Sequence, residues 1–382
     1  MDVDVAIVGA GPVGLYLAAS LLQRGIRVRI LERRRLRDRH TRAIGVHPPA
    51  LAALDSVHAA SAMVRDGVPI RTGMAVSRGR TVGTMSFDGV SDTYPFVLAL
   101  PQFRTEQILE KRVRELDGGA LVRGVEATGV TDDGGILAVA VQAAPGGAAR
   151  PEPVRASMVV GADGSRSRLR DALGIAVDRK TYAEHYLMGD FADPGLHGDM
   201  AVLFLERDGI VESFPLPGGT RRWVVRLAAP AGPANPEDLA RLVHGRTGIR
   251  PDAATNTMLS AFSVRSSQAR RTVSGRTVLI GDAAHEISPI GGQGMNLGWL
   301  DAQALVPILC DALQGRPADR KLRQFEVDRR RAASLARRQA EINMLLGRPL
   351  PPPMLQLRNA GIGAAAAVPS VNRWVARRFT MQ

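Results

Sequence analysis

The chain has 382 residues and a mass of 40.8 kDa, more than one domain usually contains, so we expect two domains. Its composition, 45% hydrophobic and 23% charged, is typical of globular proteins and excludes a wholly disordered chain. The single cysteine, Cys310, excludes an internal disulfide and any cysteine-based zinc or iron–sulfur site within one chain. We therefore predict a cytoplasmic protein without a metal site.

The formal net charge of +13 at pH 7 is compatible with an anionic partner such as a nucleic acid. Nearly all the basic residues are arginines, because Lys111, Lys180 and Lys321 are the only lysines. The chain has no recognisable nucleic-acid-binding motif, and aromatic residues, which stack on bases, make up only 4% of it. We predict a solvated arginine-rich surface and no nucleic-acid partner.

Apolar runs in the sequence are too short for a membrane span, which needs about 20 residues. The longest late run, 361–368, predicts a packed C-terminal helix in preference to one that lies on a membrane. Asp2 and Asp4 precede the first apolar run, which argues against a signal peptide.

The first 32 residues predict a strand, a glycine turn, a helix and a second strand. The run at 3–8 is apolar and strand-length, and 14–24 carries apolar residues at helical spacing, followed by Gly25 at the expected C-cap. The second strand, 27–31, ends at Glu32. This order predicts a parallel sheet with a right-handed crossover.

The rest of the chain alternates between α/β segments and β-rich insertions. Helices are predicted at 49–57, 105–116, 236–245, 292–315 and 318–346, and strands within 67–100, 120–160, 181–228 and 277–280. We predict one discontinuous α/β domain and one β-rich domain, followed by a C-terminal helical segment. Their ranges are 1–66, 101–180 and 268–345 for the first, 67–100 and 181–267 for the second, and 346–382 for the helical segment.

The first glycine turn reads Gly9-Ala10-Gly11-Pro12-Val13-Gly14 and fits G-x-G-x-x-G at a strand–helix junction. The first glycine permits a tight turn, the second lets the backbone approach a pyrophosphate, and the third allows close helix packing. The pyrophosphate then lies at the positive N-terminal end of the helix. The turn, including Pro12 and Val13, therefore predicts a dinucleotide site.

An acidic residue follows at the position expected for ribose recognition. Glu32 lies 18 residues after Gly14 at the end of the second strand, where its carboxylate can accept from ribose hydroxyls. A carboxylate there disfavours the 2′-phosphate of NADP, so FAD and NAD both remain possible at this point. We also expect Arg33, the next residue, to contact the cofactor.

Two later motifs distinguish between FAD and NAD. Residues 163–170 read Asp-Gly-Ser-Arg-Ser-Arg-Leu-Arg and fit D-G-x-x-S-x-x-R after a predicted strand. The strand at 277–280 leads into Gly281 and Asp282, and residues 289–296 read Pro-Ile-Gly-Gly-Gln-Gly-Met-Asn. With the glycine turn, these motifs make the chain resemble the class A flavoprotein monooxygenases, which include para-hydroxybenzoate hydroxylase and the aromatic polyketide hydroxylases.

The resemblance covers about residues 3–345. It implies an α/β fold like that of para-hydroxybenzoate hydroxylase, with a Rossmann-like FAD-binding domain and an interleaved β-rich substrate domain. It also implies non-covalently bound FAD, with NAD(P)H as a transient co-substrate. In that family the glycine turn holds the ADP half of FAD, and the motif at Asp163 serves both FAD and NAD(P)H.

The same resemblance assigns the later residues. Gly281 and Asp282 hold the ribityl chain and pyrophosphate, and the loop after them faces the flavin ring. Its glycines let the backbone approach the ring, and its amides at a helix start can stabilise negative charge. We expect Pro289, Gly291 and Gly292 to act at the flavin without a side-chain base, and Pro289, Gly292, Gly294, Met295 and Asn296 to bind it.

Five further residues are weaker candidates. Arg42 matches an arginine on the FAD diphosphate, and Gln102 and Arg104 match a segment along the ribityl chain, although a surface ion pair is the alternative for each arginine. For His47 and His285 we favour packing or solvation over catalysis. Phosphates of NAD(P)H are expected on the loop 163–170 and neighbouring arginines.

The implied reaction oxidises NAD(P)H through FAD and inserts one atom of O2 into an electron-rich ring, in secondary metabolism. We expect an aromatic or polyketide-like substrate, although small phenols also remain possible, against a wall formed by some of Tyr182, Tyr186, Met188, Phe191, Met200, Phe204, Phe214 and Trp223. No tryptophan lies in the W-x-W-x-I-P motif of flavin halogenases. A non-hydroxylating flavoenzyme (reductase or cyclase) and a non-catalytic flavin-binding protein remain alternatives, and no signal fixes the oligomeric state.

Overall fold

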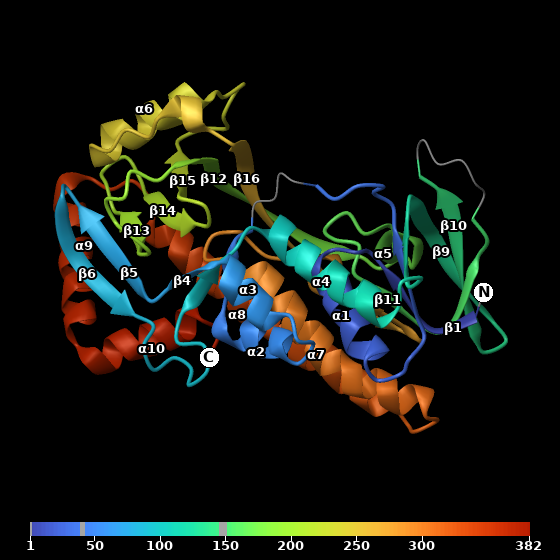
Figure 1. Ribbon diagram of the computed structural model, residues 1–382. Coiled ribbons are helices and arrows are strands. Elements are labelled where there is room, and N and C mark those ends of the chain that lie inside the picture. The colour runs from blue at the N-terminus through green and yellow to red at the C-terminus, as the bar shows by residue number, and fades with distance from the viewer. Residues whose placement is uncertain (1, 39–42, 145–150) are drawn as a thin grey trace.

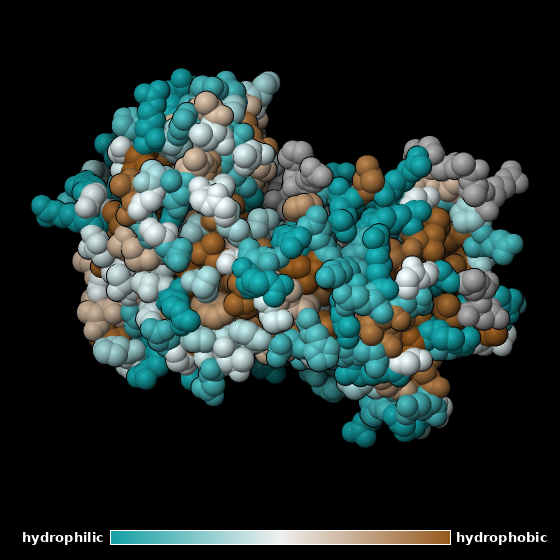
Figure 2. All heavy atoms as spheres, in the orientation of Figure 1, coloured by the Kyte–Doolittle hydropathy of each residue, from teal (hydrophilic) through white to brown (hydrophobic). Residues whose placement is uncertain are grey.

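The computed structural model describes residues 2–38, 43–144 and 151–382, folded around two large β-sheets (Figure 1). Its helices are α1 (Pro12–Leu22), α2 (Pro48–Asp55), α3 (Ala60–Asp66), α4 (Gln102–Leu116), α5 (Arg168–Ala172), α6 (Pro236–Thr247), α7 (Gln293–Leu313), α8 (Asp319–Leu346), α9 (Pro352–Ala367) and α10 (Pro369–Phe379). In Figure 2 the visible face is hollowed between the lobe of α6 and the lobe of β9 and β10.

The first sheet has the order β17-β18-β11-β1-β2-β8, with β9 and β10 continuing from β11. Its strands are β1 (Asp2–Val8), β2 (Val28–Glu32), β8 (Leu121–Arg123), β9 (Val125–Asp133), β10 (Ile136–Ala143), β11 (Val154–Gly161), β17 (Val273–Ser274) and β18 (Thr277–Leu279). From β18 to β8 the neighbours are parallel, as the βαβ pattern predicts. Helices α1, α4 and α7 cover one face of this sheet, and β9 and β10 with α5 cover the other, so strand β1 is buried on both faces.

Helix α1 begins at Pro12, two residues earlier than the apolar spacing predicts. Proline has no backbone N–H to leave unbonded and its φ suits the first helical position, so it starts the helix directly after Gly11. Trp299 of α7 donates from its indole nitrogen to the Pro12 carbonyl at 3.0 Å. The two helices that border the first sheet are therefore joined at the glycine turn.

The second sheet has the order β19-β16-β12-β15-β14-β13-β5-β6. Its strands are β5 (Thr72–Ser77), β6 (Arg80–Ser86), β12 (Val177–Ala192), β13 (Ala201–Phe204), β14 (Val211–Leu216), β15 (Thr220–Leu227), β16 (Met258–Ala269) and β19 (His285–Glu286). A small third sheet joins β3 (Gly45–Val46), β7 (Val97–Ala99) and β4 (Val68–Ile70). The domain boundaries given above remain a prediction.

The two faces of the second sheet have different partners. Side chains alternate along each strand, so neighbouring residues point to opposite faces. Phe191, Phe204 and Trp223 pack with Leu239 and Val243 of α6, which covers the outer face (Figure 1). These three aromatic side chains therefore pack under α6, on the face of the sheet away from the loop before α7, and do not line the expected substrate wall.

The opposite face, called the inner face below, packs against the loop before α7 and against α8 and α9. Tyr186, Met188 and Val224 cluster there with Ile290 of that loop and Met344 of α8. Phe214 and Tyr182 contact the same cluster. Of the residues predicted for the substrate wall, these lie on the side that faces the loop.

The C-terminal segment forms two helices, α9 and α10, beside β6 (Figure 1). A Cβ on Gly83 of β6 would lie 2.7 Å from the Cβ of Ala366, so α9 approaches this strand closely. Residues 361–367 of the late apolar run lie in α9, which packs on β6, and Val368 is its C-cap. Among the described residues no helix is both long and apolar enough to cross a membrane.

Candidate functional site

Four predicted cofactor segments meet at one edge of the first sheet. Gly9, Glu32, Asp163 and Gly281 stand at or just after the carboxyl ends of β1, β2, β11 and β18. These strands are parallel neighbours, so their carboxyl ends lie side by side. Ligands of open parallel sheets bind in this crevice.

The glycines of the first turn differ in what surrounds them. A Cβ on Gly9, whose φ is +107°, would lie 2.4 Å from the carbonyl oxygen of Ala162. A Cβ on Gly14 would lie 2.1 Å from the carbonyl oxygen of Gly9, whereas one on Gly11 would meet no atom within 4 Å. The first and third glycines therefore serve packing, and the second faces open space, as a pyrophosphate site requires.

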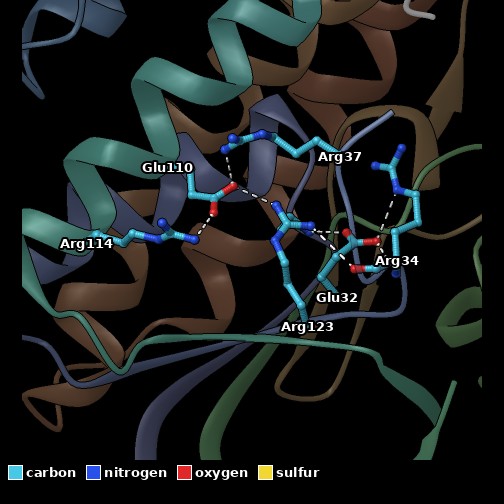
Figure 3. Close-up of polar contacts among 7 residues, drawn as sticks. Glu32, Arg34, Arg37, Glu110, Arg114 and Arg123 are labelled. Carbon is cyan, nitrogen blue, oxygen red and sulfur yellow. Dashed lines mark hydrogen bonds and ion pairs between the residues drawn. The ribbon is translucent and has the colours of Figure 1, made fainter. Parts of the chain in front are cut away.

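The carboxylate of Glu32 is fixed beside this turn (Figure 3). Its Oε2 accepts a hydrogen bond from the Ala10 amide at 2.8 Å, and its Oε1 accepts from the Arg34 amide at 2.8 Å. The side chain is buried, so these bonds hold it in one orientation. Arg33 points elsewhere, with a guanidinium nitrogen 3.8 Å from a carboxylate oxygen of Glu126.

A second buried carboxylate, Glu110 of α4, lies near Glu32 and is surrounded by arginines (Figure 3). Arg37, Arg114 and Arg123 donate to its oxygens at 2.8, 2.6 and 2.6 Å. Burial alone would raise the pKa of Glu110, but the hydrogen bond from Arg123 and the three positive charges lower it. The cluster joins α4 to β8 and to the residues after β2, and the linear sequence gives no signal for it.

The loop that begins at Asp163 is tied to the turn at Gly281. Arg170 is 2% exposed, and its guanidinium donates to the carbonyl oxygens of Ser165, at 3.3 Å, and Ala283, at 3.2 Å. The guanidinium of Arg170 is thus held by contacts within the protein. Burial raises the pKa of Asp163, whose Oδ1 is buried without a partner among the described residues.

A buried network holds the Gly281 turn, where φ is +59°. Asp301 of α7 accepts from the Gly281 amide at 3.0 Å and from Nε2 of His285 at 2.6 Å through Oδ2. Its Oδ1 accepts from Nε of Arg329 at 2.6 Å. Burial lowers the pKa of His285, but the Asp301 charge and hydrogen bond outweigh this and raise it. His285 is structural here, in line with the favoured expectation.

Asp282 follows β18, and its side chain is exposed. The surrounding protein displaces water and, with the charges of Glu286 and Asp301, raises the pKa of Asp282 to about 6. Gly294 approaches this carboxylate, because a Cβ there would lie 3.9 Å from Oδ1 of Asp282. An accessible acceptor at a strand end suits a polyhydroxylated chain.

The loop before α7 uses left-handed backbone at Gly291 and Gly292, with φ of +92° and +66°. Gly292 is the N-cap of α7, so free amides of the helix start point from this loop. Asn296 accepts from the His47 amide at 2.8 Å and donates to the Gly45 carbonyl at 3.0 Å. Its side chain therefore fixes the loop from within. Pro289 is exposed.

His47 and Met295 lie behind this loop. A Cβ on Gly292 would lie 3.7 Å from Nε2 of His47, and the Phe379 ring centroid is 5.5 Å from that of His47. Burial lowers the pKa of His47 to about 4, so the imidazole is neutral at physiological pH. Met295 is half-buried against the core of the first sheet.

Two of the weaker candidates pair with acidic side chains of the protein. Arg104 donates to the carboxylate of Asp66 at 2.6 Å, which is the ion pair considered as its alternative role. Gln102 donates to Glu106 at 2.8 Å. Arg42 lies outside the described residues.

The residues fit FAD. Gly11 leaves room at a helix N-terminus for a pyrophosphate, and Glu32 stands where a ribose would lie. Asp282 offers an accessible acceptor, and the backbone at 291–292 can approach a flat ring because it carries no side chains.

Substituting the glycines should separate binding from folding. Gly11→Ala adds a methyl group to open space, so the apoprotein Tm should stay nearly unchanged while FAD binds at least about tenfold more weakly. Gly14→Ala forces a methyl group against the Gly9 carbonyl and should destabilise the apoprotein by about 1–3 kcal/mol. Thermal unfolding and FAD titration test this, and equal Tm losses for the two variants would contradict it.

Asp301→Asn should destabilise the fold by about 3–5 kcal/mol, because Arg329 loses its carboxylate partner and burial then lowers the pKa of His285, so that its ion pair is lost as well. In the folded protein the pKa of His285 is raised above its ordinary value of 6.5. The imidazolium charge therefore stabilises the fold at low pH, and this contribution is lost as the pH rises through the raised pKa. The difference in unfolding free energy between wild type and variant should therefore shrink from pH 6 to pH 9.

Asp311→Asn on the same helix is the control, since this carboxylate pairs with the exposed Arg316 and Lys321. It should cost less than about 1 kcal/mol. Denaturant unfolding measures all three proteins, and a larger loss for Asp311→Asn would refute the role of the network.

Comparison with known proteins agrees with this geometry. A family model described as an FAD binding domain matches residues 2–340. The 6-methylpretetramide 4-monooxygenase of Streptomyces rimosus is 34% identical over 345 residues, which cover 85% of this chain and 59% of that relative. This chain thus spans less than two thirds of that relative's length.

Two solved structures share the fold. The p-nitrophenol 4-monooxygenase of Pseudomonas putida matches with a TM-score of 0.87 and 26% identity, covering 98% of this chain and 97% of that one. The anhydrotetracycline hydroxylase OxyS of Streptomyces rimosus matches with a TM-score of 0.81 and 31% identity, covering 100% and 76%. The chain belongs to the FAD-binding family of flavin-dependent aromatic monooxygenases and has their para-hydroxybenzoate hydroxylase-like fold.

Proposed function

We propose that this chain hydroxylates an aromatic or polyketide-like substrate, using FAD, NAD(P)H and O2. The observation that carries the proposal is the placement of the loop 289–292 between the cofactor residues and the inner face of the second sheet. Ile290 packs on that face while Gly292 caps α7. The relatives are named for 6-methylpretetramide, p-nitrophenol and anhydrotetracycline, and these names support an aromatic or polyketide-like substrate.

When bound, FAD supplies the redox chemistry, which no amino-acid side chain offers. One oxygen atom of O2 enters the ring and the other leaves as water, which takes up a hydride equivalent (two electrons and one proton) from NAD(P)H and one further proton from solvent. The chain's own contribution is positional. Gly11, Glu32 and Asp282 hold the cofactor, the backbone at 291–292 borders the reacting face, and apolar residues of the inner face exclude water.

The glycine turn at 9–14 is assigned to FAD, and the sequence has no second turn of this kind for NAD(P)H. We therefore expect NAD(P)H to bind at another surface of the described residues. A basic hollow of about 230 Å³ lies beside the Asp163 loop. It is lined by Ser165, Arg166, Arg170, Asp171, Arg179, Lys180, Thr181, Arg265, Ser266, Ser267 and Glu286. We propose that its exposed arginines bind the phosphates of NAD(P)H, because guanidinium groups match phosphate oxygens in charge and geometry.

The reaction itself gives the first test. Purified protein with FAD should consume O2 and NAD(P)H together when an accepted phenol or polycyclic aromatic is added. Mass spectrometry should find product heavier by one oxygen atom, labelled when ¹⁸O2 is supplied. NAD(P)H oxidation without labelled product would favour a reductase, and product rearranged without O2 uptake would favour a cyclase.

The hollow gives a second test. Arg179→Ala should raise KM for NAD(P)H about tenfold, the cost of one charge-assisted hydrogen bond, with little change in kcat. Arg316→Ala, at the surface end of α7, is the matched control and should leave both constants unchanged. Steady-state kinetics at saturating aromatic substrate measures this, and an equal KM for Arg179→Ala and wild type would rule the hollow out.

A further inference from the structure

We propose that Glu212 and Tyr186 form a polar site on the inner face that binds a hydroxyl group of the aromatic substrate. This inference rests on the proposed function and adds the chemistry by which that site selects its substrate. The ligand class is a phenol or enol, bound with its apolar rings against the rest of the inner face.

The position of Glu212 follows from the strand pairing. On β14 it stands opposite Val224 of β15 and Leu203 of β13, both apolar. Val211 and Ser213, its chain neighbours, point to the outer face, where Val211 packs under α6. Glu212 therefore projects from the inner face, among side chains that give it no polar partner.

Glu212 is a buried carboxylate without a partner. It is 8% exposed and makes no hydrogen bond or ion pair with any residue that the structure describes. Burial raises its pKa to about 7, so an ionised form is available near neutral pH to accept a hydrogen bond. A buried acid that stabilises nothing in the fold indicates a ligand-binding role.

Tyr186 provides a second unpartnered group on the same face. It is completely buried, and its hydroxyl has no hydrogen-bond partner among the described residues. Its cross-strand neighbour, Arg226, likewise has a buried Nε without a partner there. Glu184 is different, because Arg348 lies 2.7 Å from one of its oxygens.

This polar site lies next to the proposed reaction site. Ile290, between the flavin-facing residues Pro289 and Gly291, packs in one cluster with Tyr186, Met188 and Val224. Apolar surface flanked by an acceptor and a hydroxyl suits an aromatic ring with an acidic hydroxyl. The phenolic O–H would donate to Glu212, and the Tyr186 hydroxyl would bond to an oxygen of the same ligand.

Paired ligands with and without the hydroxyl test the proposal on the FAD-loaded protein. The probes are 4-nitrophenol with 4-nitroanisole, and 2-naphthol with 2-methoxynaphthalene. Isothermal titration should show wild type binding each phenol at least about tenfold more tightly than its methyl ether. Glu212→Leu should abolish this preference without weakening ether binding, and Tyr186→Phe should reduce it about threefold.

Stability provides a readout that needs no ligand. Removing an unpartnered buried carboxylate should raise Tm in both Glu212→Leu and Glu212→Gln. The folded chain keeps the proton up to about pH 7, whereas the unfolded chain releases it near 4.5, so Glu212 opposes folding increasingly between these values. Tyr186 is the titratable group that interacts with Glu212, and the charges of Arg226, Glu184 and Arg348 act on Tyr186 in turn. The gain in Tm should be larger at pH 8 than at pH 5.

Asp190→Asn is the matched control on the same face. Its carboxylate accepts from Arg222 at 2.6 Å, so this variant should lose stability and keep the phenol preference. A lower Tm for both Glu212 variants, or a wild type that does not distinguish phenol from ether, would overturn the proposal. If the phenol preference depends on Glu212 but no hydroxylated product forms with any substrate, the binding site is supported and the monooxygenase function is refuted.

Discussion

Close backbone contact at the carboxyl edge of the first sheet is the constraint on which the cofactor site depends. Gly9 lies against Ala162, and a Cβ on Gly298 of α7 would meet Val13 of α1 at 2.5 Å. Three chain segments far apart in sequence thus meet without intervening side chains. The glycines allow this close contact. Two hydrogen bonds stabilise it, one from the Gly281 amide to Asp301, which is buried, and one from the Trp299 indole to the Pro12 carbonyl, which is partly buried.

The sequence predicts those parts of the site that depend on short local segments, such as glycine turns and strand ends. Gly11 and Gly292 are positions where a ligand needs access to the backbone. Glu32 ends a strand and Asp282 follows one, and the apolar runs of both strands can be recognised in the sequence. Such features depend on a few consecutive residues. They therefore appear in the sequence before any tertiary contact is known.

The missing parts depend on pairing between distant segments. Glu110 meets Arg37 across 73 positions, and Asp301 meets Gly281 only because α7 folds back along the sheet. The aromatic residues within 181–228 predict a substrate wall but not which face of the sheet each residue occupies. In the structure they lie on both faces, and Trp223 packs under α6. Charge and hydrophobicity do not reveal which face of a strand a helix will cover.

The second sheet carries a consequence for how the chain is made. Strand β5 pairs in parallel with β13, as at Gly73 and Ala201, and 114 residues separate the end of β6 (Ser86) from the start of β13. During synthesis at about 5–20 residues per second, the β5–β6 hairpin waits on the order of ten seconds for its neighbour. Throughout that interval one edge of the hairpin is open to other nascent chains. The interleaved order of the two sheets thus leaves residues 72–86 open to pairing between chains until β13 has been made.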